Sequence, residues 1–451
     1  MNNENNNLNE VKLENQESSK KTTSKHKNGK FFSLEEFLKG VICAIVIASV
    51  FFAGYLTHYY TINPSLRSIE FLLDTYEKYY YDKVEKDLVH SIAEGILDPY
   101  SGYYTAEEYK EYQKNSQGVK VGYGLGLKGL TISSIAGNSP AEHAGIKPGG
   151  VVCGYKLATA NQFTEATDAE DFTDFLETNT KDITLKIDYN GQVEEFKLKK
   201  TEYNENYIYY TDKNGSYRFE TVNKTMQLVS YENDEVTVGD GWGYIRITAF
   251  NGLKDGTLGS AGQFDRAMAL FKENGNKKLI IDLRSNGGGY LTILAKMAAH
   301  LCDSDGLKEF PVACARYPDG KLEYFNATKN LYDQYGFESI VVLANANSAS
   351  ASEAFIGALL DYDTISQNNI VKVVLDGAVV DGATVYKTYG KGIMQSTYTN
   401  ALTGEAVKLT TAEVLWPLSK KSIHYVGITT KTDFRVYENA TEDAIAFAQT
   451  L

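Results

Sequence analysis

Hydrophobic and polar residues change their spacing several times along this chain of 451 residues, and each change predicts a different element. Residues 1–30 are almost entirely polar and lack aromatic side chains, so they cannot bury a core and are expected to be disordered. Residues 40–57 form a run of 18 residues without a charge, long enough to cross a bilayer as a helix. Apolar residues then recur at three- and four-residue steps over residues 64–114, which predicts helices.

Beyond this helical stretch, short β-like runs dominate. Alternation over Ile183–Tyr189 predicts a half-buried strand, and helices are expected at residues 140–144 and 168–177. Residues 205–240 are polar and rich in Tyr, which indicates a linker or a hairpin. From Trp242 onward, apolar runs alternate with helical patterns, as is typical of an α/β domain with buried strands.

These patterns predict a multidomain α+β fold. The predicted parts are a disordered cytoplasmic tail (1–36), a transmembrane anchor (37–60), a helical region (61–116), a small β-domain (117–201) and an α/β core domain (202–451). The length of the chain is consistent with this number of parts.

The distribution of lysines orients the predicted anchor. Lysines precede the apolar run and none follows it closely; those before it are Lys12, Lys20, Lys21, Lys25, Lys27 and Lys30. This asymmetry predicts a single-pass protein of the cell membrane, with a cytoplasmic N-terminus and the rest of the chain, after the anchor, extracytoplasmic. The alternatives are a cleaved signal peptide and a buried helix of a soluble protein. No clean A-x-A site follows the run, and a polar leader of 30 residues is long for a signal peptide.

Composition narrows the function further. The chain has 45 Lys and Arg against 58 Asp and Glu, a net charge of −13, which argues against nucleic acid as a partner. The six histidines form no HxH or HxxxH pair and the four cysteines no CxxC pair, which argues against a structural zinc site and a zinc hydrolase. Outside the cytoplasm Cys302 and Cys314 could pair, which would leave Cys153 as an odd thiol.

Two motifs of the small β-domain point to peptide binding. The alternating glycines of Val119–Leu127 (VKVGYGLGL) do not fit a dinucleotide loop, but such a loop can present N–H groups to a carboxylate. The run Ser139–Gly149 (SPAEHAGIKPG) closely matches the helix and turn of PDZ domains, which capture C-terminal peptides by strand addition. Residues 149–154 lack the acidic residue and Asn-Gly usual there. The predicted peptide-binding residues are Gly124, Leu125, Gly126 and Leu127.

A glycine-rich turn, Arg284–Gly289 (RSNGGG), joins the predicted strand Leu279–Leu283 to a helix. Backbone N–H groups exposed in such a turn could stabilise an oxyanion. They could also bind phosphate at the start of the helix, but no GK[ST] sequence follows, which excludes a P-loop. The simplest alternative is a connection that merely needs glycine.

A serine motif and a lysine motif complete the candidate chemistry. The run Asn347–Glu353 (NSASASE) follows the apolar strand Ile340–Leu343 and opens a helix, where developing negative charge is favoured, although serines also cap helices. Lys391 lies between Gly390 and Gly392. A lysine acts as a general base only when it is neutral, which requires burial; the alternative is an ordinary surface lysine in a turn.

In their order along the chain, these motifs resemble those of the carboxy-terminal processing peptidases, also called tail-specific proteases. The resemblance runs from near Ser68 to Gly427 and includes AEGILDPYSGYY at 93–104 and LTTA at 409–412. It implies that the three parts after the anchor are the helical N-terminal region of a peptidase, a PDZ domain and a ClpP/crotonase-like serine peptidase core.

The resemblance also implies the residues of the site. Ser350 would be the nucleophile and Lys391 the general base, a Ser–Lys pairing that needs no histidine. Gln395 would orient the lysine. The backbone N–H groups of Gly288 and Ala351 would form the oxyanion hole, and Asp282, Arg284 and Glu353 would support the site.

Two departures from the family pattern bear on activity. Ser350 and Lys391 are 41 residues apart, a longer spacing than the family usually has. Residues 367–384 therefore read as an insertion, in part a strand pair between 370–375 and 378–385. The other departure is Gly287, where the family commonly has proline.

The predicted function is that of a membrane-anchored serine endopeptidase that hydrolyses peptide bonds by a Ser–Lys mechanism without a metal or cofactor. Its PDZ domain would recognise free, apolar C-termini of protein substrates. One alternative is a catalytically inactive peptidase fold that binds protein C-termini. Another is a hydrolase of small esters or amides, which would leave the β-domain unexplained. A homo-oligomer is left open.

Overall fold

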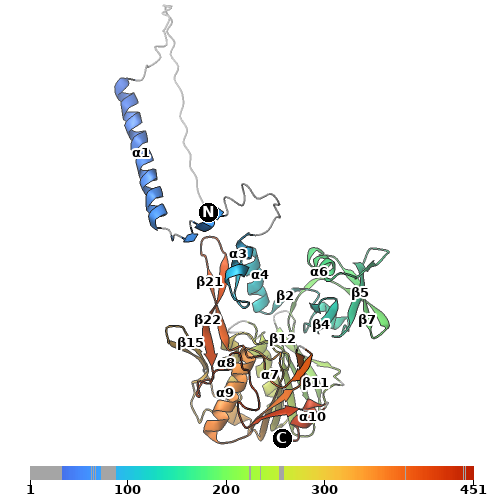
Figure 1. The fold of residues 1–451 in the computed structure, drawn as a ribbon. Helices are drawn as coiled ribbons and strands as arrows, with labels where there is room; N and C mark the ends of the chain where they lie inside the picture. Colours follow the sequence, from blue (N-terminus) through green and yellow to red (C-terminus); the bar gives the residue numbers. More distant parts are fainter. Residues whose placement is uncertain are drawn as a thin grey trace, which may run out of the picture. The chain divides into compact units, whose positions relative to one another are not determined.

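The computed structural model describes residues 33–61, 63, 65–66, 68–72, 88–222, 225–233, 235–252, 258–380, 382–439, 441 and 443–451 (Figure 1). The predicted tail up to residue 32 and part of the predicted helical region, 73–87, lie outside these residues. The chain divides into two units, 1–86 and 87–451. The fold is a mixed α/β multidomain architecture.

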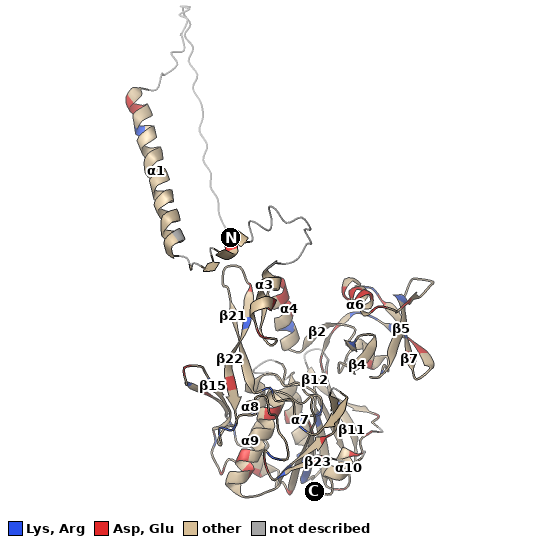
Figure 2. Cartoon of the chain, in the orientation of Figure 1, with Lys and Arg blue, Asp and Glu red and all other residues tan. Residues whose placement is uncertain are grey.

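The first unit contains a single long apolar helix, α1 (Leu34–Thr61), within its described residues. It starts three residues before the predicted anchor because Ser33 caps it: the Glu36 N–H donates to Ser33 Oγ at 3.2 Å, and the Ser33 N–H to Glu36 Oε2 at 3.3 Å. Figure 2 shows its Lys, Asp and Glu residues near this end only. By length and composition, Leu34–His58 could be a membrane anchor or a signal sequence.

The second unit begins with two helices, α3 (Leu88–Ile96) and α4 (Ala106–Ser116), separated by the short strand β1 (Gly102–Tyr104). The start of α4 is fixed by a capping box, in which Thr105 and Glu108 each accept the other's backbone N–H. β1 pairs with strand β22 of a sheet described below. The turn at residues 98–101, which precedes β1, is thereby placed against that sheet.

The small β-domain contains a six-stranded antiparallel sheet of order β3-β4-β5-β7-β8, with β6 paired to β5. Its strands are β3 (Leu125–Lys128), β4 (Thr131–Ile135), β5 (Val151–Leu157), β6 (Thr164–Glu165), β7 (Ile183–Tyr189) and β8 (Gln192–Leu198). The two predicted helices are present as α5 (Pro140–His143), capped by Ser139, and α6 (Ala169–Thr178), capped by Asp168. Phe172 of α6 is fully buried against the sheet.

A two-stranded ribbon connects this domain to the rest of the unit. β2 (Val119–Gly122) enters the domain, β9 (Thr201–Asn204) leaves it, and the two strands pair antiparallel, with Val119 opposite Asn204. The chain therefore enters and leaves the β-domain at one place.

The core domain is built on an eight-stranded sheet of order β12-β11-β10-β13-β14-β17-β18-β23, parallel from β13 to β23. Its strands are β10 (Ile208–Asp212), β11 (Gly215–Val222), β12 (Thr225–Tyr231), β13 (Trp242–Ile247), β14 (Lys278–Asp282), β17 (Ser339–Ala344), β18 (Val371–Asp376) and β23 (Val436–Asn439). The predicted linker at 205–240 thus supplies three strands of the sheet.

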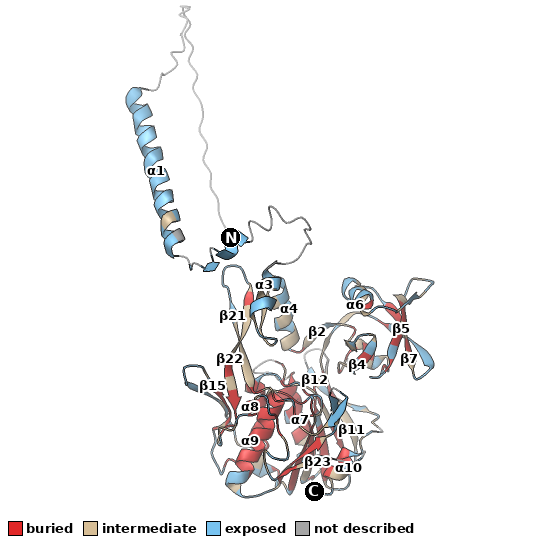
Figure 3. Cartoon of the chain, in the orientation of Figure 1, coloured by how far each residue is buried: buried red, intermediate tan, exposed pale blue. Residues whose placement is uncertain are grey.

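Helices cover both faces of this sheet. The larger core cluster joins Leu279, Ile281 and Val342 to helices α7 (Ser260–Glu273), α8 (Leu291–Ala298) and α9 (Ala351–Ser366). Alternate residues of the same strands, such as Ile280 and Val341, pack with α10 (Ala444–Ala448) on the other face. Figure 3 shows the resulting concentration of buried residues in the sheet and in α8 and α9.

A second sheet, of order β1-β22-β15-β16 with β21 paired to β22, lies beside the core. Its remaining strands are β15 (Phe310–Arg316), β16 (Leu322–Ala327), β21 (Ile393–Thr399) and β22 (Ala406–Leu415). A 3-10 turn, Tyr332–Gln334, follows β16. β21 and β22 form the hairpin labelled in Figure 1, and β21 follows directly on the segment that carries Lys391.

Two expectations from the sequence need correction. β18 is an integral strand of the large sheet, paired with β17 and β23, so the predicted strand pair between 370–375 and 378–385 is wrong. The hairpin consists only of β19 (Ala378–Val380) and β20 (Ala383–Val385). Cys302 and Cys314, considered as a pair, are both buried free thiols.

Candidate active site

Ser350 lies at the junction between β17 and α9, with a backbone conformation of φ 58° and ψ −115°. This combination of angles lies outside the left-handed region that turns commonly use, and such strained conformations cluster at functional sites. The serines on either side are fully buried: Ser348 Oγ donates to Leu283 O at 2.8 Å and Ser352 Oγ to Asn286 O at 2.9 Å. Ser350 is the serine of this motif that remains partly exposed.

The glycine-rich turn packs directly against Ser350. Gly288 has a φ of +103°, and a Cβ placed on it would lie 2.8 Å from Ser350 Cβ and 2.7 Å from Ala349 O. Only glycine permits this approach. A Cβ on Gly287 would meet no atom within 4 Å, so the glycine that replaces the family's proline is not required for space.

The predicted oxyanion donors differ in their surroundings. Ala351 is the first residue of α9, so its N–H is one of those that a helix leaves without an intrahelical partner. The Gly288 N–H instead donates to Oδ1 of the buried Asn286 at 2.8 Å, and Asn286 Nδ2 donates to Ile247 O at 2.9 Å. The structure therefore brings Gly288 to Ser350 but engages the Gly288 N–H in a hydrogen bond.

Glu353 joins the segment of the serine to the segment of the lysine. Its buried carboxylate accepts the backbone N–H groups of Ser350 at 3.0 Å, Gly390 at 2.8 Å and Lys391 at 2.9 Å. It also accepts the Thr388 hydroxyl. Burial raises the pKa of Glu353, and the four donors oppose this by stabilising the carboxylate. The predicted supporting residue thus holds the two loops together.

Lys391 is half-buried between β20 and β21. Burial and the nearby Lys408 lower the pKa of its amino group, while Asp98 opposes them. The shift is in the direction that a neutral lysine base requires. The loop of Lys391 is also tied to that of the serine, because the Tyr389 N–H donates to Ser348 O at 3.0 Å.

Gln395 on β21 points to a different partner from the one predicted. Its Nε2 donates to Thr410 Oγ1 at 3.3 Å, and Thr410 Oγ1 donates to Asp98 Oδ1 at 3.2 Å. The amide is therefore linked to the turn at residues 98–101, and not directly to the lysine amine.

Asp282 and Arg284 brace the start of the glycine-rich turn. Arg284 Nη2 lies 2.6 Å from Asp282 Oδ2 and its Nη1 lies 2.8 Å from Asp376 Oδ2. The Tyr244 hydroxyl donates to Asp282 Oδ2 at 2.7 Å. Their partners link the carboxyl ends of β14 and β18, which is a supporting arrangement.

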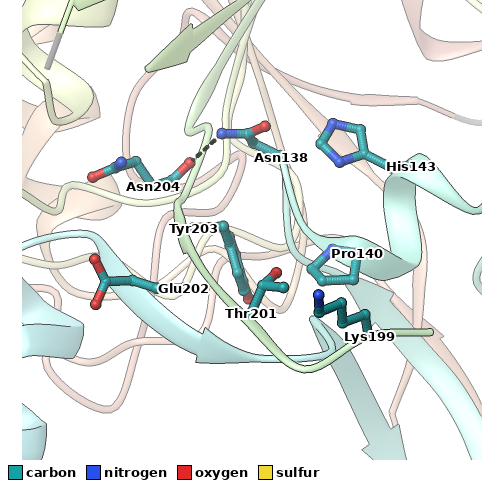
Figure 4. Close-up of a pocket in the computed structure, with 8 residues that line it drawn as sticks. All are labelled: Asn138, Pro140, His143, Lys199, Thr201, Glu202, Tyr203 and Asn204. Atoms are coloured by element: carbon teal, nitrogen blue, oxygen red, sulfur yellow. Dashed lines mark hydrogen bonds between the residues drawn. The ribbon is translucent and has the colours of Figure 1, made fainter. Parts of the chain in front are cut away.

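The predicted peptide-binding residues lie in the β-domain, where Gly124 (φ +84°) approaches Ser139 so closely that a Cβ would lie 2.1 Å from Ser139 Cβ. A separate cavity of about 340 Å³ lies between α5 and β9 (Figure 4). Its lining includes His143, Lys199 and Asn138, whose Nδ2 donates to Asn204 O at 2.8 Å. It contains none of the predicted site residues, and no cluster suited to a metal is found in the described part of the chain.

The sequence assigned no role to Tyr100, Asn286 and Thr388, which contact predicted site residues. It also assigned none to Asp98, which accepts the hydroxyl of Thr410, the partner of Gln395. The one available signal was the compact turn DPYSG followed by a capped helix.

The segment around Ser350 matches a known protein family. Residues 241–367, which include the glycine-rich turn and the serine, match the model of peptidase family S41. The chain contains an S41 peptidase domain. Lys391 and Gln395 lie beyond the matched residues of this domain.

Curated proteins are similar to the chain over longer stretches than this domain. The probable CtpA-like serine protease of Staphylococcus aureus (strain bovine RF122 / ET3-1) is 27% identical over 329 residues, which cover 72% of this chain and 55% of that protein. The chain thus spans about half the length of this relative. A probable CtpA-like serine protease of Staphylococcus epidermidis (strain ATCC 12228) is 27% identical over 432 residues, 92% of this chain and 76% of that protein.

Among solved structures, the photosystem II D1 C-terminal processing protease is 18% identical, with a TM-score of 0.46 over 83% of this chain and 88% of that chain. A putative S41 protease from Bacteroides fragilis is 17% identical, with a TM-score of 0.47 over 82% of this chain and 86% of that chain.

Proposed function

We propose that this chain is a serine endopeptidase that cleaves protein substrates near their C-termini by a Ser–Lys mechanism. The observation that carries the proposal is the carboxylate of Glu353, which binds the backbone of both Ser350 and Lys391. Ser350 lies within the residues that match family S41, and Lys391 lies beyond them. Two loops far apart in the sequence are thereby joined through one buried group. Such preorganisation is what a nucleophile and its base require.

The proposed Ser–Lys mechanism assigns a step to each of these groups. Lys391 Nζ, when neutral, removes the proton of Ser350 Oγ, which attacks the peptide carbonyl. The oxyanion receives the N–H of Ala351, at the positive end of α9, and that of Gly288 once Asn286 Oδ1 releases it. The lysine then protonates the leaving amine. Water hydrolyses the acyl-enzyme with the lysine again acting as base.

Substrate recognition is proposed to occur on the β-domain, read as a PDZ domain. β3 pairs with β4 along one edge, and no other strand in the described residues pairs with it. An edge strand next to the glycine loop Tyr123–Gly126 can accept a peptide as an added strand and its terminal carboxylate at the backbone N–H groups. Leu125 and Leu127, packed at the rim of the domain core, favour an apolar terminal residue.

The apolar helix α1 is proposed to be a single-pass anchor with a cytoplasmic N-terminus, as the lysines before it favour. The catalytic region would then lie outside the cytoplasm. A protease added outside intact single-membrane cells should digest the part after residue 61. Complete protection of that part would contradict this orientation.

A second candidate function is supported by one observation. The engagement of the Gly288 N–H by Asn286 favours an inactive peptidase fold that binds C-termini without cleaving them.

One assay separates these candidates. The full chain in detergent micelles and its Ser350→Ala variant are given an unstructured peptide with an apolar C-terminus, either free or amidated, and products are read by intact mass. We expect fragments from the unaltered chain only, and faster cleavage of the free acid. Equal cleavage of both peptides would remove the carboxylate recognition.

If neither protein cleaves the peptide, the chain could still be an active peptidase or an inactive fold that binds C-termini, and a further test is needed. A serine-reactive acylating probe then decides, because it should label the unaltered chain and not Ser350→Ala if the site is competent. Absence of labelling would support the scaffold.

A further inference from the structure

The amino group of Lys391 lies against the side chain of Tyr100, which comes from the start of the second unit in the sequence. Its Nζ is 4.6 Å from the centre of the Tyr100 ring. The Tyr100 hydroxyl lies 3.1 Å from the Tyr389 hydroxyl, a hydrogen bond in which either oxygen can be the donor. A single aromatic side chain therefore covers the lysine and is attached to the loop that carries it.

The turn that presents Tyr100 is itself held firmly. The Asp98 carboxylate accepts the Tyr100 N–H at 2.8 Å and the Ser101 hydroxyl at 2.7 Å. Ser101 Oγ accepts the Thr410 N–H at 2.9 Å, and Gly102 of β1 lies opposite Lys408 of β22. These bonds fix the turn to the hairpin that follows Lys391, and so hold the backbone of Tyr100 beside the lysine. The bond to the Tyr389 hydroxyl is the one that restrains the ring itself.

Other charged and titratable groups also face this amine. Lys408 from β22 disfavours its charge, and Asp98 favours it. Burial raises the pKa of Asp98, but hydrogen bonds from Ser101 and Tyr100 outweigh it and keep this pKa below its usual value. Asp98 is therefore an anion. The bond to Tyr389 raises the pKa of Tyr100 to about 12, with Tyr425 adding to the effect, so Tyr100 remains a neutral phenol where the lysine titrates.

We propose that Tyr100 is a positioning residue for Lys391. The Tyr100 ring shields the amino group of Lys391 from water and orients it through the attraction of a cation to an aromatic face. The proposal rests on the Ser–Lys mechanism proposed above. The two effects of the ring oppose each other. Shielding favours the neutral amine, whereas the ring face favours the ammonium.

Three substitutions separate these effects. Tyr100→Phe keeps the ring, Tyr100→Leu keeps most of the shielding but loses the ring face, and Tyr100→Ala loses both. The readout is the pH midpoint at which kcat/KM of the full chain rises, because only the neutral lysine accepts a proton.

We expect the midpoint of Tyr100→Phe to match that of the unaltered chain. Tyr100→Leu should lower it by about half a pH unit, the size of a cation–aromatic attraction at a partly exposed site. Tyr100→Ala should raise it, because water then reaches the ammonium. A purely structural role would reduce the rate without producing this order of midpoints.

A second measurement does not depend on turnover. Competitive acetylation of Lys391 by acetic anhydride at different pH values, read from the mass of the peptide containing residue 391, gives the midpoint for the amine itself. The same order of midpoints should appear even if the chain cleaves no peptide, so a failure of the proposed function is distinguished from a failure of this inference. Identical midpoints in all three variants would overturn it.

The chain supplies a matched control. Lys420 Nζ lies 4.3 Å from the centre of the Tyr324 ring, which is a contact of the same kind on the exposed strand β16. Tyr324→Leu should leave the midpoint for Lys391 unchanged. A shift equal to that of Tyr100→Leu would indicate a general change in the protein and count against Tyr100.

Discussion

Replacing Lys391 with Met should lower kcat/KM for peptide cleavage by about 10²–10⁴-fold, the range that a general base contributes. Met has nearly the length of the lysine side chain but no group that accepts a proton. The half-buried position and the backbone bond to Glu353 remain, so the fold should be retained. The measurement is kcat/KM together with the melting temperature of the same preparation.

The control is Lys329→Met, which removes a lysine from an exposed turn before residues 332–334. It should keep both activity and melting temperature. Turnover by Lys391→Met at the rate of this control would remove the lysine from the mechanism. Loss of activity accompanied by a large drop in melting temperature would show that the substitution acted through the fold.

Replacing Gly288 with Ala should lower kcat/KM by about 10²–10³-fold, as expected when an oxyanion donor is displaced. The added Cβ would lie 2.7 Å from Ala349 O and 2.8 Å from the Ala351 N–H nitrogen, and φ at this position is +103°. The turn must therefore move away from Ser350. KM should change less than kcat, because the lost contacts act on the transition state.

Gly287→Ala is the matched control, since its Cβ meets nothing within 4 Å. We expect kcat/KM close to that of the unaltered chain. If both alanine variants lost activity equally, the effect would come from general stiffening of the turn and not from the approach of Gly288 to the nucleophile.

Local signals in the sequence were sufficient for several elements. The uncharged run at 40–57 predicted α1, and a cap at Ser33 moved its start. Pro140 after Ser139, and Asp168 before an acidic first turn, marked the starts of α5 and α6. In each case, neighbouring residues determine the structure.

Long-range pairing was less visible. The segment of β10–β12 was read as a linker or a hairpin. Its many tyrosines obscure the alternation of polar and apolar residues, although Tyr210 is fully buried in the core. β18 was assigned to an insertion because the spacing from Ser350 to Lys391 is long, whereas its pairing with β23 joins segments far apart in the chain. Nothing near a strand in the sequence specifies which parallel neighbour it will have.

In the candidate site too, some features could be predicted from local motifs and others could not. Motif order brought Ser350, Glu353 and Lys391 together as candidates, and the structure joins their loops through Glu353. The bond from Gly288 to Asn286 and that from Gln395 to Thr410 depend on rotamers, which motifs do not specify. The contact of Tyr100 with Lys391 requires the pairing of β1 with β22, which no local pattern encodes.

The ribbon formed by β2 and β9 also has a consequence for how such proteins diversify. Because Val119 and Asn204 are paired neighbours, the residues between them form a domain inserted into the rest of the second unit. Exchange of that domain for another would leave the backbone ends at the same separation. Selection could therefore change the proposed recognition domain without rebuilding the domain that carries the proposed catalytic residues.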